Sequence, residues 1–138
     1  MINIKLEGLK AAIKTVEPER LKGICKKALS AYALKVDSDA KLRCPVDLGQ
    51  LRSSINPVTD NLDNLEVSFV AGVDYAAYVE FGTGPYAAKY VPSLDPEWQK
   101  IAKKYYINGE GRMPAQPFLY PAVINNLPLI NKKLEELL

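Results

Sequence analysis

The sequence CPVDLGQLRSSI, residues 44–55, separates two different patterns in this chain of 138 residues. Before it, apolar residues recur at the spacing of a helix, and after it they alternate with polar residues as in a strand. Pro45 disfavours the helical conformation at Cys44 and cannot donate a hydrogen bond to the preceding turn. We therefore expect a long helix to end at about Arg43.

Within this stretch the sequence predicts one short helical turn over residues 48–53. Asp47 stands where an N-cap is needed, because its carboxylate can accept the backbone N–H groups of Gly49 and Gln50. Leu51 supplies an apolar anchor for this turn. A strand is expected to follow.

The helix before this stretch is predicted over residues 18–43, with Pro18 at its first position. Its lysine-rich face is interpreted as solvated, and contact with DNA phosphates is the alternative. The apolar face consists of Leu21, Ile24, Cys25, Ala28, Leu29, Tyr32, Val36 and Ala40, and the lysines are Lys22, Lys26, Lys27, Lys35 and Lys41.

The N-terminal residues contain two shorter signals. Alternating apolar residues predict a strand over residues 2–6 that stops at Gly8, and a brief amphipathic helix is expected over residues 9–16.

After residue 53, two strands are predicted, over residues 53–59 and 65–73. The turn between them, residues 60–64, is rich in Asp and Asn, whose side chains bond to their own backbone. Pro57 lacks a backbone N–H, so the first strand should lie at an edge of the sheet. A strand of another subunit can extend such an edge.

Residues 75–81 predict a short helix that Gly82 ends. The carboxylates of Asp74 and Glu80 lie near its aromatic residues. A general acid–base pair is one interpretation, and a capping Asp with an ion-paired Glu is the commoner arrangement.

Residues 84–116 form a long connection that is expected to protrude as a loop insertion. Asp95, followed by Pro96, predicts a single short helix inside it. Its Tyr and Trp side chains either form a protein interface or cover the core of this domain, and both interpretations stay open.

The last helix is predicted to begin in the run QPFLYPA, residues 116–122, and Pro128 should divide it near Asn126. Its inner stripe is expected to be Val123, Leu127, Ile130, Leu134 and Leu137.

Together these elements predict a single α+β domain over residues 1–138. A long N-terminal helix and a C-terminal helix should pack on a small, mainly antiparallel sheet, with a long loop insertion that contains a short helix. The composition, 48% hydrophobic and 25% charged, is that of a globular protein. No stretch has the length of a signal peptide or a membrane span, so we expect folding in a cytosol and no membrane partner.

The chain contains no histidine, which removes the commonest general base and metal ligand. It also lacks a phosphate-binding loop and the spacing of a metal site. We therefore expect a protein that is not an enzyme, without catalytic residues, cofactor, metal or small-molecule substrate. Charge is unevenly placed, positive over residues 1–60, negative over 61–96 and positive over 97–138, which favours self-association.

Three runs in the chain resemble one family, the tail-completion or head–tail joining proteins of tailed bacteriophages, typified by the gene-product-ten protein of a lambdoid phage. Leu48 and Gln50 depart from the family pattern, in which Thr and a basic residue are usual. The matching residues are Pro45, Val46, Asp47, Gly49, Leu51, Arg52, Ser54 and Ile55 in the first run, Tyr75, Ala76, Tyr78, Val79, Glu80, Phe81, Gly82 and Thr83 in the second, and Pro117, Phe118, Leu119, Pro121 and Ala122 in the third.

The resemblance implies a virion structural protein of a phage or prophage, assembled in the cytoplasm of the host bacterium. Such a neck or connector protein completes the tail and joins it to the head as a homo-oligomeric ring, hexameric in the virion. Its partners would be head-closure and tail-tube proteins, with phage DNA nearby. We assign interface roles to Arg52, Glu80, Tyr86, Tyr90, Trp98 and Arg112, and structural roles to Pro45, Asp47, Gly49, Leu51, Tyr75, Tyr78, Phe81, Gly82, Pro117, Phe118 and Pro121.

Two rival hypotheses remain from the residues alone. A small nucleic-acid-binding module would use the lysine face of the long helix together with Lys100, Lys103 and Lys104. A hydrolase would use Asp74 and Glu80.

Overall fold

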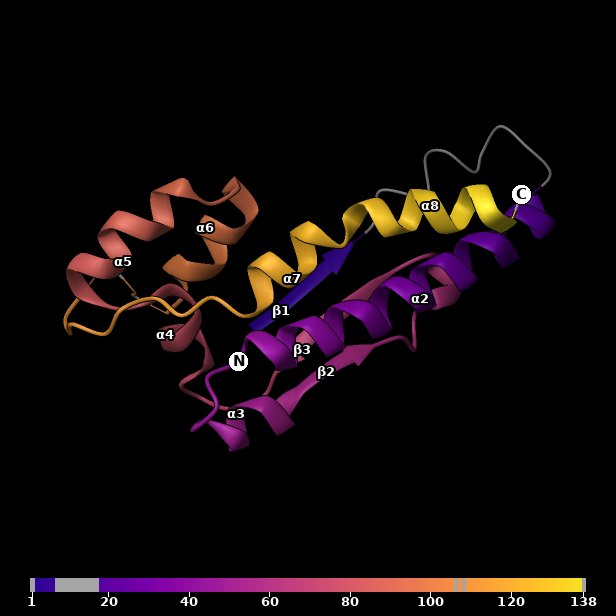
Figure 1. The fold of residues 1–138 in the computed structure, drawn as a ribbon. Helices are drawn as coiled ribbons and strands as arrows, with labels where there is room; N and C mark the ends of the chain where they lie inside the picture. The colour runs from indigo at the N-terminus through magenta and orange to yellow at the C-terminus, as the bar shows by residue number, and fades with distance from the viewer. Residues whose placement is uncertain (1, 7–17, 106, 108, 138) are drawn as a thin grey trace.

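A computed structural model describes residues 2–6, 18–105, 107 and 109–137 of the chain (Figure 1). The predicted helix over residues 9–16 and the predicted stop at Gly8 lie outside the described residues. The elements are β1 (Ile2–Leu6), α2 (Pro18–Arg43), α3 (Gly49–Ser54), β2 (Ile55–Val58), η1 (Leu62–Asn64), β3 (Val67–Ala71), α4 (Ala76–Phe81), α5 (Gly84–Tyr90), η2 (Val91–Ser93), α6 (Pro96–Lys103), α7 (Leu119–Asn125) and α8 (Leu127–Leu137).

The three described strands form an antiparallel sheet in the order β1-β3-β2. Val67, Phe69 and Ala71 of β3 are buried, and α2 lies across β2 and β3. The predicted α+β class, with its small antiparallel sheet, is confirmed.

The prediction that Pro57 marks an edge strand is also confirmed. Gly72 N–H donates to Ser54 O at 3.2 Å, and continuing that register places the N–H positions of Ile55 and Pro57 on the side away from β3. Ile55 N–H donates instead to Arg52 O, and Pro57 has no N–H. The outer side of β2 therefore offers carbonyl oxygens but no donors at these positions, which makes it a poor template for a strand from another subunit.

The long helix α2 provides the main apolar surface of the core. The predicted stripe from Ile24 to Ala40 is buried, and the predicted end at Arg43 is confirmed. Tyr32 packs edge-on against Phe69 with ring centroids 6.0 Å apart, and its hydroxyl donates to Val123 O at 2.7 Å. This bond joins α2 to α7, and both α7 and α8 pack along α2 (Figure 1).

The C-terminal helix is divided at Asn126, as Pro128 predicted. Asn126 donates to Asp39 Oδ2 at 2.7 Å and to Ala122 O at 2.8 Å, so the break itself is bonded to α2. The predicted inner stripe is only partly right, because Leu127 and Leu137 are exposed. In α8, Ile130 is the buried residue.

Residues 84–116 contain more helix than predicted. The helix after Asp95 is present as α6, but α5 and η2 precede it, so the prediction of a single helix is wrong. Pro85 in the first turn favours the start of α5. We call residues 84–105 the helical cap, which forms a separate group of helices at one end of the molecule in Figure 1.

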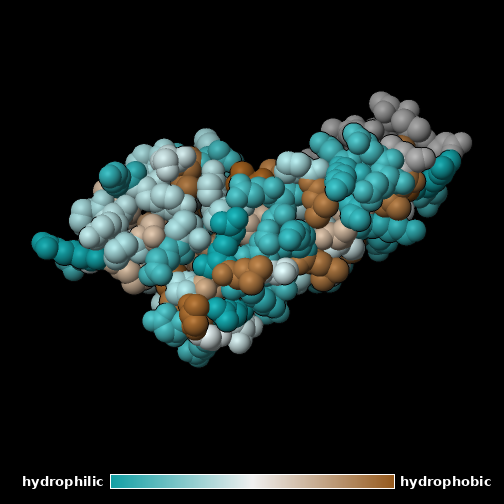
Figure 2. Space-filling model, in the orientation of Figure 1, coloured by the Kyte–Doolittle hydropathy of each residue, from teal (hydrophilic) through white to brown (hydrophobic). Residues whose placement is uncertain are grey.

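Apolar side chains remain on the surface along α2 and at its connection to α3 (Figure 2). The most exposed of them are Leu34, Leu42 and Val46. None of the described helices is long and apolar enough to cross a membrane.

Candidate interaction site

Residues 44–49 form a tight connection between α2 and α3. Leu48 N–H donates to Pro45 O at 3.1 Å, and this turn makes Leu48 the residue that precedes α3. No side-chain hydrogen bond caps the helix, and Asp47 is exposed. The prediction that Asp47 caps α3 is therefore wrong, because the turn over residues 45–48 moves the cap position from Asp47 to Leu48.

The helix α3 is held by its other residues. Leu51 is fully buried, as predicted for an anchor. Arg52 Nη2 donates to Cys44 O at 3.4 Å, which ties α3 to the end of α2. Arg52 Nε is buried and has no hydrogen-bond partner among the described residues. Arg52 therefore has a structural contact and one donor that the described residues leave unused.

The second family run forms α4 and its ending, as predicted. Ala76, Val79 and Phe81 are buried, while Tyr78 is 39% exposed. Gly82 has φ 75, and a Cβ at this position would lie 2.7 Å from the backbone N of Ala115. Only glycine therefore lets residues 111–116 pass this close to the end of α4.

Glu80 binds the start of α7 instead of facing solvent. Its side chain is fully buried, and its Oε2 accepts Phe118 N–H at 2.8 Å and Leu119 N–H at 2.9 Å, while Oε1 accepts Tyr120 N–H at 2.8 Å. Burial raises the pKa of Glu80, and the three N–H donors act in the opposite direction. The carboxylate caps a helix from about forty residues away.

The prediction that Glu80 lies on an interface is therefore wrong. Sequence reasoning missed its real role because the cap and the helix belong to different runs. A missing cap could have indicated this role. The helix that starts after Phe118 has no capping side chain of its own, so its N–H groups need an acceptor from another part of the chain.

Residues 111–116 run beside the end of α4 without regular secondary structure. Thr83 N–H donates to Met113 O at 2.8 Å, and Met113 N–H donates to Thr83 Oγ1 at 2.7 Å. Gln116 N–H donates to Val79 O at 2.8 Å. The second family run is thus bonded to the segment that precedes the third run, and Glu80 bonds it to the third run itself.

A groove of about 1010 Å³ lies where the first two family runs meet residues 111–116, which precede the third run. Its walls combine apolar side chains with amide and charged groups, and the exposed Tyr78 is among its lining residues. We call it the motif groove. It is lined by Pro45, Asp47, Leu48, Gly49, Gln50, Tyr75, Tyr78, Val79, Thr83, Gly111, Arg112, Met113 and Gln116.

The remaining predicted interface residues differ in how far their side chains are exposed. Trp98 is only 3% exposed and packs edge-on against Phe81 and Tyr120, with ring centroids 6.5 and 5.0 Å apart. Its assignment to an interface is wrong, and the alternative, that it covers the domain's own core, is right. Tyr86 and Arg112 are exposed and Tyr90 is partly buried. Their interface roles stay predictions.

Four of the eight lysines proposed for DNA contact already bind carboxylates. Lys26 contacts Asp63 at 2.6 Å, Lys35 contacts Asp39 at 3.3 Å, and Lys41 contacts Asp37 at 3.0 Å. On α6, Lys100 is 3.7 Å from Glu97. The lysine face is therefore an ion-paired surface, as in the solvated interpretation.

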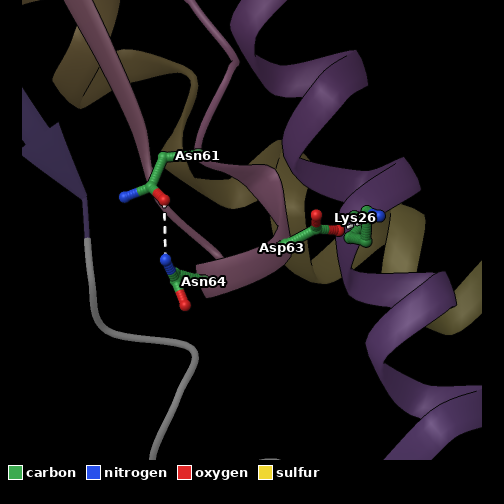
Figure 3. Close-up of polar contacts among 4 residues, drawn as sticks. All are labelled: Lys26, Asn61, Asp63 and Asn64. Carbon is green, nitrogen blue, oxygen red and sulfur yellow. Dashed lines mark hydrogen bonds and ion pairs between the residues drawn. The ribbon is translucent and has the colours of Figure 1, made fainter.

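The turn between β2 and β3 is acidic and well organised (Figure 3). Asn64 Nδ2 donates to Asn61 Oδ1 at 2.7 Å, and Asn61 also bonds to Glu66. The ion pair of Asp63 with Lys26 fixes the turn to α2 (Figure 3). The predicted turn is present, but these hydrogen bonds of its Asn side chains go to other side chains and not to the backbone as predicted.

The described residues contain no group of three or more side chains that could hold a metal ion. Cys25 and Cys44 are buried and free.

A family model described as "Bacteriophage HK97-gp10, putative tail-component" matches residues 7–82. The match spans more than half of the chain and covers the first family run and the second except for Thr83, and residues of both runs line the motif groove. No curated protein and no solved structure was found to match the chain. The sequence runs and the family model agree, and the chain belongs to the HK97-gp10-like family of phage tail components.

Proposed function

We propose that this tail component acts at the junction of head and tail, where copies form a ring that completes the tail and presents a face to head-closure proteins. One observation carries the proposal: the first two family runs, which lie far apart in the sequence, meet residues 111–116 at the motif groove, directly before the third run. Residues needed only for the core would be buried, whereas Tyr78 and Asp47 are exposed at this groove.

The proposed role is structural and not catalytic. The one acidic pair considered for catalysis is unsuitable, because Glu80 is fully buried and its carboxylate is occupied by three backbone N–H groups, whereas Asp74 is exposed.

Assembly through the edge of β2 is disfavoured by the missing donors at Ile55 and Pro57. The surfaces that support assembly are the motif groove and the exposed apolar residues at the end of α2. Tyr86 and Arg112 extend the first of these, since Arg112 lines the groove and Tyr86 lies just beyond Thr83.

Electron microscopy of a lysate tests the proposal. The gene is disrupted in the parent phage or prophage, and the particles are imaged after induction. We expect full heads beside separate tails, with joining restored by the intact gene on a plasmid. Normal infectious particles would contradict the proposal.

A second variant links the result to the groove. Tyr78→Ser removes an exposed aromatic side chain, so the fold should be retained while joining is lost. Tyr105→Ser, at a partly buried tyrosine outside the groove, is the matched control.

A further inference from the structure

The end of α2 and the start of α3 carry an exposed surface that combines apolar and basic side chains. Leu42 is 79% and Val46 is 85% exposed. Arg43 is exposed between them, and Arg52 lies on the adjoining helix. We call these four residues the α2–α3 end. Figure 2 shows apolar surface in this part of the molecule.

The arginines of this surface are not neutralised in the way that the nearby lysine is. Lys41 is paired with Asp37, whereas neither Arg43 nor Arg52 has an ion-pair partner among the described residues. A depression of about 390 Å³ is lined by Arg52, Leu42, Lys41, Ser38 and Asp37. Asp37 Oδ1 is buried there without a hydrogen-bond partner among the described residues, and Arg43 is the arginine of this surface that lies outside the depression. The unused donor Arg52 Nε lies in this region, while Asp47 lines the motif groove. The surface is suited to an acidic partner with some apolar area.

The turn at residues 60–66 has the complementary character. It carries three acidic side chains, and Asp63 stays 81% exposed even while paired with Lys26. Asp60 is exposed and has no ion-pair partner in the described part of the chain. Leu62 adds partly exposed apolar surface. The hydrogen bonds in Figure 3 hold the turn in one conformation, so little entropy would be lost on docking.

These two surfaces lie at opposite ends of α2. The turn is attached at Lys26, and Leu42 is sixteen residues further along, which corresponds to roughly 24 Å of helix. One copy therefore cannot bring its own turn to its own α2–α3 end. We propose that the 60–66 turn of one copy docks on the α2–α3 end of a second copy, with Asp60 facing Arg43 and Arg52.

A contact between two different surfaces of the same chain repeats from copy to copy, so it closes into a ring or continues as a filament. The inference rests on the proposed ring at the head–tail junction, and it names the two surfaces that would form that ring.

Cross-linking in assembled tails tests the contact. Arg43→Cys and Asp60→Cys are introduced together, and purified tails are treated with a short bis-maleimide. The natural Cys25 and Cys44 are 4% and 3% exposed, so they should not react. We expect a ladder of covalently linked copies from the double variant. Each single variant should give no more cross-linked product than the wild type.

A second pair serves as the matched control. Arg112→Cys with Asp60→Cys places the same residue types at the motif groove instead of the α2–α3 end. A ladder from this pair alone, or no ladder in tails that contain the protein, would overturn the inference. Absence of the protein from wild-type tails would instead contradict the proposed function.

Charge reversal provides a readout that does not depend on cysteine chemistry. Arg43→Asp and Asp60→Arg should each reduce the yield of joined particles by about tenfold, because like charges then face each other across the contact. The two reversals together should restore most of that yield. A double variant that joins no better than the single variants would overturn the inference.

Discussion

The helices α3 and α7 begin in opposite ways. At the start of α7, three N–H groups are bonded to the buried carboxylate of Glu80, which comes from another part of the chain. At the start of α3 there is no side-chain cap, and Asp47 lies exposed beside it. The comparison shows that α7 is positioned by a polar contact, whereas α3 is positioned by packing of Leu51 and by the tie from Arg52.

The largest effect should come from removing the remote cap. Glu80→Ala leaves three buried N–H groups without acceptors, and at about 1 to 3 kcal/mol each we expect a loss of about 4 kcal/mol in the free energy of unfolding. Glu80→Gln keeps one acceptor oxygen and should cost less. Urea unfolding measures both, and a loss below about 1 kcal/mol for the alanine variant would mean that water replaces the carboxylate.

The packing that holds α3 can be removed in the same way. Leu51→Ala should cost about 3 kcal/mol, because it deletes a fully buried side chain and leaves a cavity. Leu48→Ala, at a partly exposed position beside it, is the control and should cost less. Equal losses in the two variants would show that packing at Leu51 does not position α3.

The change in unfolding free energy that the titration of Glu80 causes should be smaller than the loss from Glu80→Ala or Leu51→Ala. Because burial raises its pKa, the folded protein binds more protons than the unfolded chain between the ordinary and the raised value. The stability that Glu80 contributes is thus fully present at a pH below its ordinary pKa, and it is lost as the pH rises through the raised pKa of the folded protein. The difference in unfolding free energy between wild type and Glu80→Gln should shrink with rising pH. A difference that grows would mean that the N–H donors outweigh burial.

The smallest effect is expected at Asp47. Asp47→Ala should change the free energy of unfolding by no more than about 0.5 kcal/mol, because the side chain makes no capping hydrogen bond. A true N-cap would cost about 1 kcal/mol. Thermal unfolding of wild type and variant distinguishes these values, and a clear destabilisation would show that Asp47 caps α3 in solution.

Local signals in the sequence predicted most of the fold. The end of α2, the edge position of Pro57, the glycine that ends α4 and the division at Asn126 all follow from the backbone preferences of single residues. Each depends only on neighbours in the chain, so each could be predicted without knowing the tertiary structure.

The site was less predictable because its contacts join distant residues. The hydrogen bonds of Glu80, the burial of Trp98 and the helices of the cap depend on packing that no local pattern reports. The prediction for Asp47 failed for the opposite reason: an Asp residue suits a cap, but the turn over residues 45–48 moves the helix start by one residue. The resemblance nevertheless identified two of the segments that line the motif groove, and in its third run the helix start that Glu80 binds.

The bond from Glu80 to the start of α7 also has a consequence for the order of folding. Tyr120 lies forty residues after Glu80, so the chain must close a long loop before this contact can form. The sheet hairpin and its packing on α2 need no such closure and should form first. In refolding experiments Glu80→Gln should therefore speed unfolding while leaving the folding rate nearly unchanged.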